Sequence, residues 1–155
     1  MPRASDQARP RRDPGSTGEP GEVEVRVRYA ETDQMGRAYH AHYVVWCEVG
    51  RTDLMRGLGT SYGELEERGV YLPVSNLEVS FRRAAEYEDR VRITTEVEAV
   101  RSRSVTFDYE LHRLPDEELL ARARTELVCV NADGAPRRLP DGVRELLRGR
   151  AVESP

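Results

Sequence analysis

Apolar and polar residues alternate in the first apolar segment of the chain, over residues 23–29. Every second residue is apolar, and most positions between are charged. A period of two predicts a β-strand with one buried face and one face in water. The apolar positions are Val23, Val25, Val27 and Tyr29. A polar loop from Ala30 to Arg37 follows this strand.

From about Ala41 the spacing of the apolar residues lengthens to three and four, which predicts a helix with one buried side. Gly50 lies on this stripe, and glycine inside a helix costs about 1 kcal/mol relative to alanine. We therefore expect another element to pack closely against Gly50. Ser61 and Glu64 have the spacing of a capping box, which predicts a short second helix ending near Gly69. The positions on the stripe are Tyr43, Cys47, Gly50, Leu54 and Leu58, widened by Trp46 and Met55.

Period two then returns and marks four more strands. Their inward-facing positions start at Leu77, Val91, Val105 and Leu119. The links between them are short and polar, at residues 86–89, 101–103 and 114–117. Three short links in series predict that consecutive strands are antiparallel neighbours. A last helix is expected near residues 142–148, capped by Asp141.

One long helix beside an antiparallel sheet predicts an α+β domain of two layers, over residues 21–150. The sheet has more long strands than one helix can cover, which leaves a spare face and free edges. We therefore expect an oligomer. Residues 1–20 contain four prolines and almost no apolar side chains. They are expected to form a disordered N-terminal tail.

Composition narrows the possible classes of protein. The 155 residues carry a formal net charge of −4, which disfavours a nucleic-acid binder built on overall positive charge. No apolar run reaches the roughly 18–20 residues of a membrane span. All 24 basic residues are arginine, so lysine-dependent chemistry is excluded. Cys47 and Cys129 are expected to be buried free thiols, which favours a reducing compartment and a cytoplasmic location.

A dense polar cluster at residues 29–43 joins the first strand to the long helix. The first amides of a helix lack intrahelical partners and carry partial positive charge, so they can bind an anion or a developing oxyanion. Asp33 precedes the helix by about seven residues, and Gly36 permits a tight turn between them. Asp33 is therefore a candidate catalytic carboxylate. The alternative is that Asp33 only caps a turn.

Other reactive side chains support weaker hypotheses. His40 and His42 point in different directions on a helix and have no third ligand nearby in sequence, so no metal site is predicted. A proton relay through His40 stays open. Cys47 lies on the apolar stripe and is assigned to the core. Glu48 is a second carboxylate candidate; the alternative is an ordinary ion pair with Arg51 or a contact with Thr52 on a partly exposed side of the helix.

Two further sequence features bear on the chemistry. No G-x-S-x-G segment is present, so serine hydrolase chemistry has no support. Arginines cluster at residues 82–83 and in the segment 101–104, where they alternate with serines. Guanidinium forks and hydroxyls suit phosphate oxygens, and the alternative is ordinary surface charge.

The polar cluster also carries a family resemblance. Its pattern is Tyr29-x-Glu31-Thr32-Asp33-x-x-Gly36-x-x-Tyr39-His40-x-x-Tyr43, followed by Glu48-x-x-Arg51-Thr52. This pattern resembles the acyl-CoA thioesterases of the 4-hydroxybenzoyl-CoA thioesterase type, near the Tol-Pal-associated branch. The resemblance covers about residues 23–139. It implies the hotdog fold, in which a five-stranded antiparallel sheet wraps a long central helix and two subunits pair into one sheet. The implied assembly is a homodimer or a homotetramer.

The resemblance also implies roles for single residues. Asp33 would be the catalytic carboxylate, as nucleophile or general base, and the backbone N–H of His40 would polarise the thioester carbonyl. Tyr39, Tyr43 and Met35 would shape an acyl pocket at a dimer interface. The CoA tail would lie along Arg101, Ser102, Arg103 and Ser104. The implied reaction is hydrolysis of an acyl-CoA, or acyl carrier protein, thioester to a free acid and a thiol. No metal or redox cofactor is implied, since coenzyme A is part of the substrate.

The sequence departs from the family pattern at two points. Ala84 stands where the family often has proline, and Gln34-Met35 replaces a pair of small residues. Two other functions stay open. One is a hotdog hydratase or dehydratase that uses Asp33 together with His40. The other is an acyl-CoA-binding module without catalysis.

Overall fold

Alternation of apolar and polar residues produces the sheet, and the three-and-four spacing produces the long helix, as the sequence predicts. The computed structural model describes residues 19–151, so the predicted N-terminal tail lies almost wholly outside the described residues. The elements are β1 (Gly21–Arg26), η1 (Tyr29–Glu31), α1 (His40–Gly57), α2 (Tyr62–Glu67), β2 (Val74–Phe81), β3 (Arg90–Val100), β4 (Ser104–Leu114), β5 (Glu118–Val128) and α3 (Asp141–Arg148).

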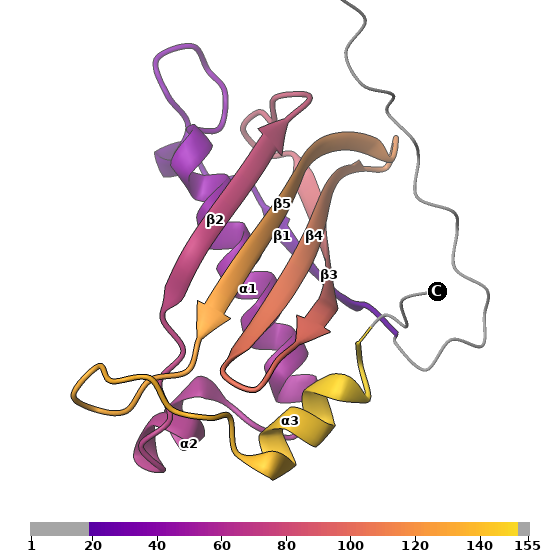
Figure 1. Cartoon of the computed structure of the whole chain (residues 1–155). Helices are drawn as coiled ribbons and strands as arrows, with labels where there is room; N and C mark the ends of the chain where they lie inside the picture. Colours follow the sequence, from indigo (N-terminus) through magenta and orange to yellow (C-terminus); the bar gives the residue numbers. More distant parts are fainter. Residues whose placement is uncertain (1–18, 152–155) are drawn as a thin grey trace, which may run out of the picture.

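The five strands form one antiparallel sheet in the order β1-β3-β4-β5-β2. Helix α1 packs on one face of this sheet, chiefly on β1, β3 and β4 (Figure 1). The predicted α+β arrangement of a long helix against a five-stranded antiparallel sheet is therefore confirmed. Within residues 19–151, no helix combines the length and the apolar character that crossing a membrane requires.

The prediction that all three short links join neighbouring strands is wrong for one of them. The links at 101–103 and 114–117 close hairpins, but β2 and β3 lie three positions apart in the sheet order, with β4 and β5 between them. Residues 82–89 form a crossover that is bonded to other segments along its length. Ala38 N donates to Ala85 O at 2.8 Å, and Glu88 N donates to Val27 O at 3.0 Å. These bonds hold the crossover across the end of the sheet.

Gly50 marks the closest approach of α1 to the sheet. A Cβ atom added there would lie 2.5 Å from Thr95 Oγ1 and 2.8 Å from Ile93 Cγ2, both on β3. The predicted close packing is therefore confirmed. Cys47 and Cys129 are both buried free thiols, as predicted.

The ends of three elements test finer predictions. Ser61 Oγ accepts a hydrogen bond from Glu64 N at 3.1 Å, which confirms the predicted cap of α2.

The first strand ends at Arg26, and Tyr29 is 77% exposed in η1 instead of buried in the strand. Asp141 is the first residue of α3 and pairs with Arg144, so the prediction that Asp141 caps this helix is wrong. The N-cap is Pro140, which lacks a side-chain acceptor.

Candidate active site

The segment before α1 folds into a small hairpin. Thr32 pairs with Ala38, Asp33 N donates to Arg37 O at 2.8 Å, and Tyr39 N donates to Glu31 O at 2.8 Å. Gly36 has a φ of +76°, a left-handed conformation that glycine adopts without strain, so the tight turn lies where the sequence predicts it. The hairpin therefore holds Asp33 in a fixed place relative to the start of α1.

The two carboxylate oxygens of Asp33 have different surroundings. Oδ1 accepts hydrogen bonds from Met35 N at 2.9 Å and from Arg37 N at 3.3 Å. Oδ2 makes no hydrogen bond to any residue between 19 and 151, and the side chain is partly exposed. The turn-capping alternative thus applies to one oxygen. The other oxygen is free to accept a proton or to contact a ligand.

The start of α1 lacks a side-chain cap. Its N-cap residue is Tyr39, which accepts no capping hydrogen bond, and the first turn contains no acidic residue. The amides at His40 and the next position therefore keep the partial positive charge of a helix N-terminus. In the hairpin, Asp33 lies two residues beyond the Glu31–Tyr39 pair, or about 7 Å along the strand direction. The hydrogen-bond distance from a helix amide to a carbonyl oxygen, the C=O bond and the attack distance from a carboxylate oxygen to the carbonyl carbon together come to about this length.

Glu31 is a site residue to which sequence reasoning assigned no role. It is buried, and its Oε1 accepts from Arg28 N at 2.8 Å while its Oε2 accepts from Trp46 Nε1 at 3.2 Å. Burial acts to raise the pKa of Glu31, but the hydrogen bonds from Arg28 and Trp46 outweigh it and hold the pKa below 4.5. His42 Nδ1 lies 3.7 Å from the same carboxylate. The only signal in the sequence was its place in the motif, because one acidic residue in a polar loop has no periodicity.

The aromatic candidates divide into exposed and buried residues. Tyr39 is 46% exposed, and its ring centroid lies 4.3 Å from that of His40. Met35 is 75% exposed at the tip of the hairpin. Tyr43 is buried, and its hydroxyl accepts a hydrogen bond from Ala85 N at 2.9 Å. Met35 and Tyr39 thus lie on the surface, at the tip and at the base of the Asp33 hairpin, whereas the buried Tyr43 holds the crossover against the core.

The segment Arg101–Ser104 does not join these residues within one chain. Ser102 O accepts from Leu139 N at 2.9 Å, and Arg103 O accepts from Cys129 N at 2.8 Å, which places the segment near α3. Figure 1 shows α2 and α3 at one end of the sheet and the loop before α1 at the other. A substrate that contacts both Asp33 and this segment would need the segment from a second subunit.

The remaining candidates lie apart from Asp33. Glu48 is exposed on α1 and forms no ion pair with Arg51 in the described part of the chain. Burial raises the pKa of the Cys47 thiol to about 12, with only partial compensation from the nearby Arg51. The structure therefore keeps Cys47 in the core as a protonated thiol.

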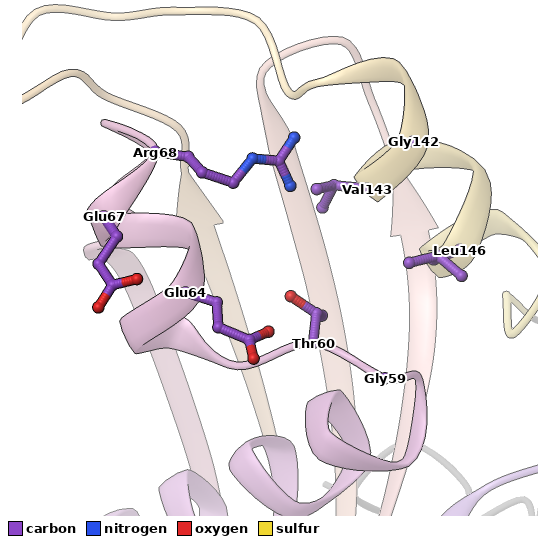
Figure 2. A pocket seen from close by; sticks show the side chains of 8 residues that line it. All are labelled: Gly59, Thr60, Glu64, Glu67, Arg68, Gly142, Val143 and Leu146. Carbon is purple, nitrogen blue, oxygen red and sulfur yellow. The ribbon is translucent and has the colours of Figure 1, made fainter.

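A hollow of about 470 Å³ lies at the end of the molecule opposite Asp33. Figure 2 shows Thr60, Glu64 and Arg68 on one side of it, with Val143 and Leu146 of α3 on the other. None of the predicted site residues lines this hollow.

Comparison with known proteins assigns the fold to a family. Residues 27–147 match the model of the thioesterase-like superfamily. The chain is 38% identical over 110 residues to YneP of Bacillus subtilis, which covers 71% of this chain and 79% of that protein. It is 33% identical to the acyl-CoA thioesterase YbgC of Haemophilus influenzae, over 69% of this chain and 78% of that one.

A solved structure agrees with this match and confirms the hotdog fold. The DHNA-CoA thioesterase from Staphylococcus aureus superposes with a TM-score of 0.78 at 34% identity, covering 84% of this chain and 87% of that chain. The family model, the relatives and the fold agree over the same residues. The chain belongs to the thioesterase-like superfamily.

Proposed function

We propose that this protein hydrolyses acyl-CoA thioesters to a free acid and coenzyme A, with Asp33 as the catalytic carboxylate. The observation that carries the proposal is the hairpin, which fixes one oxygen of Asp33, leaves the other without a partner among residues 19–151, and leads into an uncapped helix start. The acyl-CoA thioesterase named among the relatives supports the substrate class. Placement in the 4-hydroxybenzoyl-CoA type, near the Tol-Pal-associated branch, rests on the motif from Asp33 to His40 and belongs to this proposal.

The proposed chemistry starts at the thioester carbonyl. Either Asp33 takes a proton from an attacking water, or its carboxylate attacks the carbon and water then cleaves the anhydride. Both routes put negative charge on the carbonyl oxygen, and the His40 amide would stabilise it. One aimed donor of this kind contributes roughly 3–4 kcal/mol where it has been removed from other enzymes. In both routes the tetrahedral intermediate collapses by breaking the C–S bond, and the sulfur leaves as a thiolate that takes up a proton; in the nucleophilic route this step forms the anhydride.

Asp33→Asn tests the carboxylate. The amide keeps the size of the side chain and removes the charge, so we expect kcat to fall by at least about 100-fold while acyl-CoA still binds. The assay is thiol release over aromatic, short, medium and long acyl-CoAs and one acyl carrier protein. Asp133→Asn, in an exposed loop, is the matched control. Wild-type kcat in Asp33→Asn would overturn the assignment and direct the next test to Glu48→Gln.

Isotope labelling and mass spectrometry together separate the two routes. In a single turnover in H₂¹⁸O, cleavage of the anhydride at the Asp33 carbonyl puts ¹⁸O into the Asp33 carboxylate and leaves the product acid unlabelled. The general-base route puts ¹⁸O into the product acid, as does cleavage of the anhydride at the acyl carbonyl. Acylation of Asp33, detected by rapid quench and mass spectrometry, occurs in the nucleophilic route alone. Loss of enoyl-CoA absorbance without thiol release would favour the hydratase instead. Tight binding without turnover on the whole panel would favour the binding module.

We propose further that the protein is a homo-oligomer in which β2 meets a second copy. Strand β2 is at the edge of the sheet, and α1 leaves it largely uncovered. Val74, Leu77 and Phe81 on β2 are 45%, 40% and 50% exposed. Val45 and Val49 on α1 are also exposed. An edge strand with this much apolar surface needs a partner, and a second copy could also bring its segment 101–104 toward Asp33.

A cytoplasmic location follows from the two unpaired thiols and is part of the same proposal.

A further inference from the structure

Four arginines surround a hollow of about 330 Å³ at the same end of the sheet as Asp33. The lining residues are Arg37, Arg82, Arg83, Ala84, Glu86 and Arg113. They come from the hairpin before α1, from the crossover after β2 and from the end of β4. Four guanidinium groups and one carboxylate leave this lining with a net positive charge, in a chain whose overall charge is negative.

Two of the four guanidinium groups already have acidic partners. Arg83 Nε lies 3.2 Å from Glu118, and the Arg113 guanidinium lies 2.7 Å from Asp116. Arg37 and Arg82 make no side-chain hydrogen bond or ion pair with any residue from 19 to 151. The hollow therefore has two guanidinium groups whose donors are unused, and two whose positive charge is largely offset by an acidic neighbour.

The backbone around the hollow is held in place by hydrogen bonds. Arg37 forms a β-bridge with Glu86, which joins the hairpin to the crossover. The amides of Arg82 and Arg83 both donate to Leu120 O, at 2.8 and 3.1 Å. The arginines are thus presented from fixed positions on three elements, which lowers the entropy cost of gathering them around a ligand.

We propose that this arginine pocket binds a phosphate group. Guanidinium groups offer paired N–H donors that match the oxygens of phosphate and hold it through two parallel bonds. Two unused guanidinium groups suit the two charges of a phosphate monoester. The phosphate comes either from the nucleotide end of acyl-CoA or from free phosphate in solution.

If the phosphate belongs to acyl-CoA, the arginine pocket serves the thioesterase activity, and this part of the proposal rests on the proposed function. The backbone of Arg37 closes the Asp33 hairpin. A substrate with its phosphate in the pocket and its thioester at Asp33 would therefore bind to a single subunit. The segment Arg101–Ser104 lies at the far end of the sheet and can serve the same substrate only from a second subunit. The arginine pocket thus offers a route for the CoA tail that uses no residue of another subunit.

The test combines binding with kinetics on the full chain. Calorimetry measures binding of sodium phosphate and of adenosine 3′,5′-bisphosphate. Thiol release is compared between an acyl-CoA and the same acyl group on pantetheine, which carries no phosphate. The variants are Arg37→Gln with Arg82→Gln, and Arg101→Gln with Arg103→Gln. Arg148→Gln, an exposed arginine on α3, is the matched control.

For substrate phosphate, we expect the Arg37/Arg82 double variant to bind the bisphosphate at least about tenfold more weakly. Its KM for acyl-CoA should rise by a similar factor, with kcat and the pantetheine reaction unchanged. Weaker binding of sodium phosphate without any change in KM supports the pocket with free phosphate as its source. Equal binding of both probes by wild type and double variant, or binding by neither, overturns the proposal. A rise in KM confined to the Arg101/Arg103 variant, with bisphosphate binding lost only there, also overturns it. The binding arm needs no turnover, so it reports on the pocket even if hydrolysis is never seen.

Discussion

Trp46 Nε1 donates a hydrogen bond to Glu31 Oε2 at 3.2 Å, which ties the end of η1 to the middle of α1. The backbone of the same glutamate accepts from Tyr39 N at 2.8 Å. One residue thus secures both ends of the hairpin that carries Asp33. The position of the candidate catalytic carboxylate depends on a buried carboxylate two residues before it.

Glu31→Gln should destabilise the protein. Glutamine replaces one acceptor oxygen with an amide group, which would face the N–H donors of Arg28 or Trp46. Loss of a buried acceptor costs about 1–3 kcal/mol. Urea denaturation followed by Trp46 fluorescence measures this, since Trp46 is the chain's one tryptophan. A variant as stable as wild type would show that the contact does not hold the hairpin.

The same carboxylate predicts a pH dependence of stability. The pKa of Glu31 is lower in the folded chain than its ordinary value of 4.5. The group therefore adds stability above pH 4.5, and this contribution is lost as the pH falls through the folded-state pKa. We expect the free energy of unfolding to fall less steeply with acid in Glu31→Gln than in wild type. Denaturation curves between about pH 6 and 3 check this, and parallel slopes would contradict it.

Gly50→Ala should be costly. The added Cβ would lie 2.5 Å from Thr95 Oγ1, so α1 must move away from β3. Overpacking of this kind costs about 1–3 kcal/mol. Gly57→Ala is the matched control on the same helix, because its Cβ meets nothing within 4 Å. Thermal melts should show a lower Tm for Gly50→Ala and an equal or higher Tm for Gly57→Ala.

The two thiols should be unreactive in the folded protein. Burial raises the pKa of Cys47 to about 12 and also raises the pKa of Cys129. Thiolate is the reactive form, and neither sulfur is open to solvent. A disulfide reagent at pH 8 should modify neither thiol on the time scale on which it modifies both in urea. Rapid labelling of Cys47 in the folded chain would return it to the list of reactive groups.

Leu77→Arg should weaken self-association if β2 meets a second copy. A charge on the exposed apolar edge would be buried without a partner in the assembly. Leu146→Arg on α3 is the matched control, because the two leucines are 40% and 43% exposed. Sedimentation should show a shift to monomer for Leu77→Arg alone. An unchanged mass for both variants would place the subunit contact elsewhere.

The sequence predicted the parts of this fold that repeat and missed the parts that depend on a single contact. Alternation at Val91, Ile93 and Val97 shows which face of β3 is buried, and the structure agrees. Alternation does not show which strand lies alongside, so the crossover between β2 and β3 was predicted as a hairpin link. Tyr29 continues the period of β1, yet the bond from Arg28 N to Glu31 turns the chain before it.

The candidate site shows the same division. The sequence could place Asp33 and Gly36 in a turn before a helix, because turn and helix signals are local. It could not show that Arg37, Arg82 and Arg113 share one hollow, because their meeting depends on the crossover. Nor could it show that Arg101 lies at the other end of the sheet.

The crossover also bears on the order in which the molecule assembles. Strands β3, β4 and β5 join through short turns and can zip together from neighbouring segments of chain. The two outer pairings, β1 with β3 and β2 with β5, close loops of several dozen residues and carry a larger entropy cost. The central meander should therefore gain protection first in pulsed hydrogen exchange. The Asp33 hairpin is joined to the crossover by the β-bridge between Arg37 and Glu86. It should therefore be among the last parts of the protein to become native.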